Sequence, residues 1–261
     1  FNKKIFNQNH IKSKGVILVE FHNWHPLHIA FSFLSNFLSK KFLSQIVAYP
    51  GYINISQNID QNFTNKIKWT VGNFLGLKNF GVYRSFGTKK ILYPMMSKEI
   101  IKKGTIETEK KFKKLKNKND VLKINIEGIL IGDLIYDTFL KKFKVETVDI
   151  KSADFYEFFQ NTVILFYYWK NYFKLNKVNA VIISHAVYTL AIPARIAMSN
   201  KVKVFISNHS SIYNLTKKNY LSFKEFKFFK SKYLKLNKKI RNLGIKIAKD
   251  RIKKRFEGKI G

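Results

Sequence analysis

The sequence has no cysteine, only four prolines and little negative charge, and each shortage excludes something. Without cysteine, a disulfide framework, a cysteine zinc site and thiol chemistry are all impossible. Acidic residues number 16 against 49 Lys and Arg, which gives a formal net charge of +33. A hydrophobic fraction of 46% nevertheless supplies a core, which argues against intrinsic disorder. The length fits one large domain or two small ones.

Arginine is also scarce, because only five of the 49 basic residues are Arg and 44 are Lys. Dedicated nucleic-acid binders usually rely on Arg, whose planar fork recognises phosphates and guanines. The Lys excess accompanies 24 Asn and 25 Phe, which share A/T-rich codons, so a biased genome explains the composition and makes nucleic acid the less favoured partner. Attraction to an anionic inner-membrane surface stays open, since each nearby Lys contributes about 1 kcal/mol there.

Long apolar runs are missing as well. The most apolar stretch, residues 163–169, is far shorter than the roughly 20 residues that a membrane span requires. No signal peptide is visible at the start of the sequence. We therefore expect a cytoplasmic protein, either soluble or peripheral on the inner face of the cytoplasmic membrane. Because the sequence starts on Phe1 and ends on a Gly-x-x-Gly stretch after a Lys-rich helix, we also expect a fragment cut at both ends.

Several signature motifs are absent, and their absence excludes enzyme classes. No GxxxxGK[ST] loop is present, which excludes a P-loop NTPase, and no GxGxxG follows a strand, which argues against a dinucleotide oxidoreductase. An Asp-x-Asp pair and a GxSxG elbow are missing too, which disfavours metal-dependent sugar transferases and α/β-hydrolases. RNA-recognition and zinc-finger signatures do not occur.

Apolar runs of strand length alternate with helical patterns along the chain, which predicts an α/β fold with a doubly wound, mostly parallel Rossmann-like sheet and helices on both faces. We expect this domain over residues 1–214, followed by a basic helical segment over 215–261 that leads to a missing second domain. The predicted strands cover residues 15–20, 45–49, 81–86, 121–126, 178–184 and 202–207. The predicted helices cover residues 26–41, 65–77, 97–116, 133–142, 154–173, 190–200 and 223–256, with a capping box at Asp154 and Glu157.

Polar side chains follow three of these strands, at the edge where ligands bind in such sheets. The first loop holds His22, Asn23 and His25, of which one His could be a general base or could merely cap the next helix. We expect no metal there, because Glu20 is the only nearby acid.

The second and third loops also carry a His at a strand end. His185, Tyr188 and Arg195 follow the second loop's strand, next to a helix N-terminus suited to an anionic or sugar ligand. His209 follows the third strand among small hydroxyl residues. Each of these His residues could also be a satisfied side chain with no function.

A further cluster lies at residues 127–138, where two glycines precede a helix. Asp133 and Asp137 share one face of that helix, so a carboxylate could act as a base or bind hydroxyl groups. The structural alternative is that Asp133 caps the helix and Asp137 pairs with Lys141.

Residues 128–140, GILIGDLIYDTFL, together with Ser184–Tyr188 and Arg195–Ala197, resemble bacterial surface and capsular polysaccharide biosynthesis proteins. The resemblance implies a glycosyltransferase of the two-domain GT-B type, of which this chain would be the N-terminal, acceptor-side half. It implies metal-independent transfer with no cofactor: a nucleotide-sugar is the donor and a glycan or lipid-linked molecule is the acceptor. The residues carried over as a site are His22, His25, Gly132, Asp133, Tyr136, Asp137, His185 and Tyr188.

Taken together, these observations predict a catalytic role for His22, His25 or Asp133. The predicted substrate-binding residues are Asn23, Gly132, Tyr136, Asp137, His185, Tyr188, Arg195 and His209. Two alternatives remain open: a non-enzymatic basic protein that binds nucleic acid, and a non-catalytic subunit of a polysaccharide-synthesis complex.

Overall fold

The computed structural model describes residues 5–6, 13–50, 63–93, 95–207, 211–221 and 227–259. The chain divides into two compact units, residues 1–220 and residues 221–261. The first contains a six-stranded sheet in the order β3-β2-β1-β6-β7-β8, in which β8 alone is antiparallel to its neighbour. Its strands are β1 (Val16–Phe21), β2 (Gln45–Pro50), β3 (Thr88–Ile91), β6 (Val178–Ile183), β7 (Lys203–Ser207) and β8 (Ile212–Leu215). The predicted α/β, mostly parallel Rossmann-like fold is confirmed.

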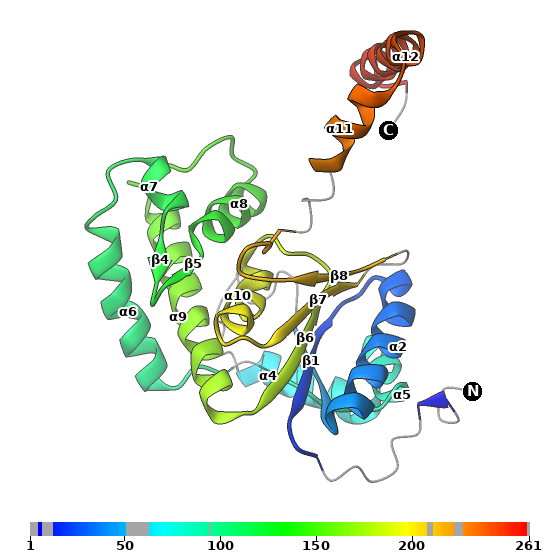
Figure 1. Ribbon diagram of the computed structural model, residues 1–261. Coiled ribbons are helices and arrows are strands. Elements are labelled where there is room, and N and C mark those ends of the chain that lie inside the picture. The colour runs from blue at the N-terminus through cyan, green and yellow to red at the C-terminus, as the bar shows by residue number, and fades with distance from the viewer. Residues whose placement is uncertain are drawn as a thin grey trace. The chain divides into compact units, whose positions relative to one another are not determined.

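Helices cover both faces of the sheet, as Figure 1 shows. On one face, alternate strand residues such as Ile17, Val19 and Ile182 pack against α2 (His25–Phe42) and the segment around α5 (Asn79–Ser85). The opposite face carries α9 (Ala153–Leu175) and α10 (Ile192–Ser199), which follows the short helix η1 (Thr189–Ala191). Strands buried on both faces are apolar throughout, which explains the uninterrupted runs in the sequence.

Outside the sheet, α6 (Lys98–Phe112) packs along α9, where Gly104 lets the two helices approach because a Cβ there would collide with Ile164. The remaining elements of the first unit are α4 (Phe63–Leu75), α7 (Lys118–Leu122), the hairpin of β4 (Asn125–Ile126) and β5 (Ile129–Leu130), and α8 (Gly132–Phe143). Among the described helices, none is long and apolar enough to cross a membrane.

Two predicted strands are wrong. Residues 81–86 lie mostly in α5, because Phe80, Tyr83 and Phe86 recur every third residue and all turn toward the core, and the third strand is β3 instead. Residues 121–126 do not form one strand either. Asn117 and Asp120 form a capping box that starts α7, and only Asn125–Ile126 is extended.

Two predicted helix features also differ. Helix α9 is capped by Ser152, whose hydroxyl accepts a hydrogen bond from the Phe155 N–H, so Asp154 and Glu157 are not its capping box. The predicted helix over 223–256 is two helices, α11 (Lys227–Lys235) and α12 (Lys238–Phe256), because Asn237 caps a new start by accepting from the Ile240 N–H. Residues 222–226 lie outside the described residues.

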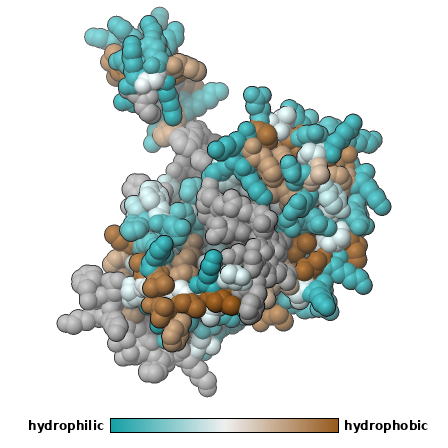
Figure 2. Space-filling model, turned by 180° about the vertical axis from the view of Figure 1, so that it is seen from behind, coloured by the Kyte–Doolittle hydropathy of each residue, from teal (hydrophilic) through white to brown (hydrophobic). Residues whose placement is uncertain are grey.

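The basic segment differs from the rest of the chain in burial: no residue of α12 is buried. Residues 227–259 carry fourteen Lys and Arg against two acidic residues. Exposed apolar side chains are interspersed among them, as the segment at the upper left of Figure 2 shows, with Leu243 58% and Phe256 90% exposed.

Candidate active site

The sheet reverses its winding direction between β1 and β6, and this point fixes where a ligand can bind. From β1 the chain adds β2 and β3 on one side, whereas β6 begins the other side with β7. Val19 pairs with Ile182, so the segments that follow β1 and β6 leave the carboxyl edge next to each other. In open α/β sheets the connections diverge at such a switch point, and the crevice between them is the usual ligand site.

A fully buried carboxylate, Glu20, lies at this point. Its Oε2 accepts a hydrogen bond from the Ser184 N–H at 2.6 Å, and Ser184 Oγ lies 2.9 Å from Oε1 and 2.8 Å from Oε2. None of the ion pairs found among the described residues involves Glu20. Burial therefore dominates and raises the pKa of Glu20 to about 7, although the hydrogen bonds from Ser184 act in the opposite direction.

His185 extends this cluster toward solvent. Its Nδ1 lies 2.8 Å from Ser184 Oγ, so the serine hydroxyl stands between the imidazole and the Glu20 carboxyl group. Partial desolvation lowers the pKa of His185, and the positive charge of Lys141 on α8 lowers it further. Lys141 Nζ also lies 4.3 Å from the centroid of the Tyr188 ring. Tyr188 has a φ of 62°, an uncommon conformation for a residue with a side chain.

His22, just beyond β1, is held in a defined orientation by its neighbours. Its Nδ1 accepts a hydrogen bond from the Trp24 N–H at 2.8 Å, which places the ring proton of the neutral imidazole on Nε2. Its carbonyl lies 2.8 Å from His28 Nε2, and its N–H donates to the Tyr83 hydroxyl at 2.9 Å. Desolvation first, then the nearby His185 and His28, lower the pKa of His22. In the neutral ring, His22 therefore has its Nδ1 lone pair occupied and its Nε2–H available as a donor.

The other two predicted residues of this loop lie at its outer side. Asn23 accepts a hydrogen bond from Asn79 Nδ2 at 2.7 Å, which connects the loop to the start of α5. His25 begins α2, and its ring stacks on that of His28 with centroids 5.4 Å apart. Both contacts support the loop that carries His22.

Asp133 and Arg195 form a second cluster, between α8 and α10. Arg195 Nη2 lies 2.6 Å from Asp133 Oδ2, its Nη1 donates to the Leu130 carbonyl at 3.1 Å, and its guanidinium stacks 4.1 Å from the Tyr220 ring centroid. The Arg195 side chain is only 5% exposed. Asp133 is not the N-cap of α8, which begins after Ile131 without a side-chain cap. This pair holds the α8–α10 packing together.

The remaining predicted residues are dispersed around α8. Gly132 allows close chain packing, because a Cβ there would collide with the Val121 carbonyl. The Tyr136 hydroxyl lies 3.3 Å from Thr147 Oγ1. Asp137 is exposed, and its pKa is raised by desolvation and by the charge of Asp133. His209 lies outside the described residues.

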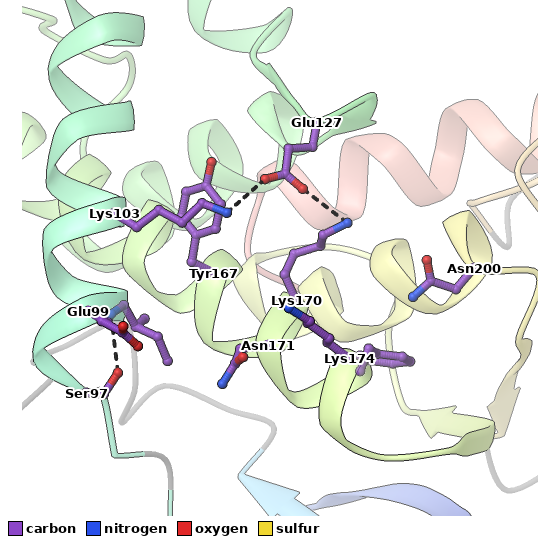
Figure 3. A pocket seen from close by; sticks show the side chains of 11 residues that line it. Ser97, Glu99, Lys103, Glu127, Tyr167, Lys170, Asn171, Lys174 and Asn200 are labelled. Carbon is purple, nitrogen blue, oxygen red and sulfur yellow. Dashed lines mark hydrogen bonds and ion pairs between the residues drawn. The ribbon is translucent and has the colours of Figure 1, made fainter.

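A cavity of about 700 Å³ lies elsewhere, between α6 and α9 (Figure 3). Lys103 and Lys170 converge there on Glu127, at 3.3 and 3.2 Å. None of the residues predicted as a site lines this cavity. Within the described residues, no group of three or more His, Asp or Glu side chains could hold a metal ion.

The comparisons with known proteins yield little. No family model matches the chain, and no curated protein matches it. A solved structure of a CDPS (cyclodipeptide synthase) from Fluoribacter dumoffii matches with 12% identity and a TM-score of 0.39, covering 75% of this chain and 84% of that chain. A likeness of that size assigns this chain neither the family nor the activity of that protein.

These findings correct the function expected from the sequence. The resemblance to surface and capsular polysaccharide biosynthesis proteins is wrong, because no such family matches and the matching structure is a CDPS, not a glycosyltransferase. The assignments drawn from the resemblance fall with it: the GT-B glycosyltransferase, the nucleotide-sugar donor and the glycan or lipid-linked acceptor.

Sequence reasoning missed Glu20 and Ser184, although both were visible. Glu20 is the only charged residue in an otherwise apolar strand, VILVEF, and Ser184 directly follows a second apolar strand, VNAVII. A charged residue at the buried end of a central strand was the available signal, since such a group is rarely buried unless paired.

Proposed function

We propose that this chain is an enzyme that catalyses a proton transfer on a small polar molecule bound at the switch point between β1 and β6. The observation that carries the proposal is the different hydrogen bonding of two imidazoles at one sheet edge. His22 uses its Nδ1 as an acceptor, whereas His185 directs its Nδ1 to a hydroxyl backed by a buried carboxyl group. Perturbed titratable groups gathered in a crevice are typical of catalytic sites.

The two imidazoles have complementary roles. When Ser184 donates its proton to ionised Glu20, its oxygen accepts the His185 Nδ1–H, and His185 Nε2 keeps a lone pair that can remove a proton. His22 presents its Nε2–H and can donate a hydrogen bond to an oxygen of the substrate that gains negative charge. Because the pKa of each ring is lowered, both are neutral near pH 7, as these roles require.

The surroundings of His185 indicate the class of substrate. Lys141 supplies a positive charge next to the base, and the Tyr188 ring beneath it is half-buried. We therefore expect a small molecule with a hydroxyl or carbonyl group beside a carboxylate or phosphate.

The test combines binding with turnover. Imidazole ¹⁵N spectra of the whole chain are recorded with a panel of hydroxy acids and phosphorylated hydroxyketones in D₂O, while solvent exchange of substrate protons is followed by ¹H NMR. We expect one class to shift the His22 and His185 signals together and to exchange protons, and we expect His185→Gln to reduce the exchange at least 100-fold. Asn214→Ala, at an exposed position of the edge strand β8, is the control. Full activity of His185→Gln, or no panel member that shifts both rings, overturns the proposal.

We further propose that residues 227–259 bind an anionic membrane surface. The support is the excess of fourteen basic over two acidic residues, combined with exposed apolar side chains and a helix that buries nothing. Lysines close to such a surface each contribute about 1 kcal/mol, and apolar side chains add insertion into the headgroup region.

Vesicle flotation tests this second proposal. The chain should float with vesicles of phosphatidylglycerol and phosphatidylcholine but not with phosphatidylcholine alone. Replacing four lysines of α12 by Gln should weaken binding at least tenfold: Lys238, Lys239, Lys246 and Lys249. Replacing four exposed lysines of the first unit should change it less: Lys102, Lys110, Lys114 and Lys118. Equal loss in both variants, or binding to nucleic acid but not to vesicles, overturns it.

A further inference from the structure

We propose that Glu20 and Ser184 form a proton relay that decides which nitrogen of His185 carries the ring proton. The inference deepens the proposed function, because it makes the two buried residues positioning groups for the base. It rests on three groups connected in series by hydrogen-bond distances: the Glu20 carboxyl group, Ser184 Oγ and His185 Nδ1.

The geometry of the serine makes the relay two-state. Ser184 Oγ lies 2.8–2.9 Å from both carboxyl oxygens of Glu20 and 2.8 Å from His185 Nδ1. A hydroxyl has one proton, so it can donate to only one of these partners and must accept from the other. Ser184 is 7% exposed and Glu20 is fully buried, so the carboxyl end of the relay is shielded from water.

The protonation state of Glu20 determines which of the two hydrogen-bond arrangements of Ser184 forms. With Glu20 ionised, Ser184 donates to the carboxylate, His185 donates its Nδ1–H to Ser184, and Nε2 is the free base. With Glu20 protonated, Oε2 still accepts the Ser184 N–H and the proton lies on Oε1. Oε1–H then donates to Ser184 Oγ, the serine donates to His185 Nδ1, and Nε2 carries the ring proton.

The same three groups can carry the proton that the substrate loses in a catalytic step, from His185 through Ser184 to Glu20. A proton moves from the substrate to His185 Nε2, the Nδ1 proton moves to Ser184 Oγ, and the serine proton moves to Glu20. The substrate is left as the anion and Glu20 as the neutral acid, while the imidazole and the serine end neutral. The reverse sequence returns the proton, so no further reactant is needed. A carboxyl group whose pKa lies near neutrality is suited to both directions.

Other groups around the relay come from several elements. Burial first, and then the charge of Glu20, raise the pKa of Tyr49 on β2, whose buried hydroxyl has no hydrogen-bond partner among the described residues. From α5, the Tyr83 hydroxyl donates to the Glu20 carbonyl at 2.6 Å. Desolvation and the charge of Lys141 on α8 lower the pKa of His185, and His185 in turn contributes to the lowered pKa of His22. Both phenols stay neutral because burial raises the pKa of Tyr49 and Tyr83, so Glu20 is the group of the relay that titrates near pH 7.

Long-range ¹H–¹⁵N NMR of the whole chain distinguishes the two His185 tautomers directly. In the wild type the Nδ1–H form should replace the Nε2–H form as the pH rises through about 7. Glu20→Gln should hold the Nε2–H form at every pH above the pKa of His185, because its amide donates permanently to Ser184. Ser184→Ala should raise the pKa of Glu20, read by ¹³C NMR, because the serine hydroxyl lowers it, and should abolish the response of His185 to that titration.

Ser207→Ala is the matched control. Ser207 ends the neighbouring strand β7, is fully buried, and its hydroxyl has no partner among the described residues. This variant should keep the wild-type tautomer curve. A wild-type His185 tautomer that ignores the Glu20 titration overturns the relay, as does a Ser184→Ala variant that still follows it.

Failure of the relay and failure of the proposed function give different results. If ligands still shift both imidazoles and His185→Gln still loses exchange, only the relay is wrong. If the tautomer follows Glu20 but no panel member binds, the proposed catalytic function is wrong while the relay stands.

Discussion

Glu20 is fully buried and Asp133 is partly buried, and the two carboxylates have different partners. Asp133 has a cation 2.6 Å away in Arg195, and the pair joins α8 to α10. Glu20 accepts hydrogen bonds from the Ser184 N–H and hydroxyl and forms no ion pair in the described part of the chain. Burial therefore raises its pKa to about 7. A carboxylate paired with a buried cation contributes to the structure, whereas one held only by hydrogen bonds can exchange a proton. The sheet edge at Glu20 is therefore where we propose that the chemistry takes place.

The largest expected effect comes from breaking the Asp133–Arg195 pair. Arg195→Met should lower the free energy of unfolding by about 3 kcal/mol, because it leaves a partly buried carboxylate without its cation. Urea denaturation measures this. Arg84→Met, which removes an exposed Arg that donates to the Asn73 and Phe74 carbonyls, should cost under about 1 kcal/mol.

A double variant sharpens this test. Asp133→Leu together with Arg195→Met should be more stable than Arg195→Met alone, because no unpaired charge remains. If the double variant is as unstable as the sum of the single variants, the pair is not the source of the loss.

The next expected effect is a pH dependence of the free energy of unfolding that arises from the titration of Glu20. Its pKa in the folded chain lies above the unfolded value of 4.5, so folding favours the protonated form and stability falls as the pH rises from about 4.5 to about 7. The loss should reach about 3 kcal/mol at 1.36 kcal/mol per pKa unit. Glu20→Gln should not show this loss. Denaturation at pH 5 and pH 8 should therefore show that the free energy of unfolding of the variant, relative to that of the wild type, is higher at pH 8 than at pH 5. A constant difference between the two proteins at both pH values would exclude a raised pKa.

Tyr83→Phe should have a smaller effect on the same region. The hydroxyl donates to the Glu20 carbonyl and accepts from the His22 N–H, so its removal leaves two backbone groups without a partner and costs about 2 kcal/mol. Tyr136→Phe, which removes only a 3.3 Å contact with Thr147 near α8, should cost under about 0.5 kcal/mol. Thermal denaturation compares them, and equal losses would contradict this account.

The smallest effect concerns charge alone. Lys141→Gln should raise the pKa of His185, because the positive charge of Lys141 lowers it. Imidazole NMR titration measures the shift, and His28, whose pKa is lowered chiefly by desolvation, serves as the internal reference. A His185 pKa that falls or stays fixed would remove Lys141 from the site.

The helices and strands with one clear pattern were predictable. The apolar runs at Val16–Phe21 and Val178–Ile183 predict buried parallel strands, and their alternation with helices predicts the sheet. Segments with competing signals were not: residues 81–86 fit a strand locally, but their aromatic side chains reach the core only as a helix. The site was half predictable, since the histidines at the strand ends are visible in the sequence and their tautomers are not.

By itself the sequence determined the α/β class, the high positive charge and the presence of His22 and His185 after two apolar strands. Those features depend on composition and local periodicity. Only the tertiary structure decided that Glu20 and Ser184, 164 residues apart, share two hydrogen bonds through the serine hydroxyl and one through its N–H. It also decided that, among the described residues, Asp133 has a cationic partner and Glu20 has none, because neighbours far apart in the chain set the environment that fixes each carboxyl group's charge.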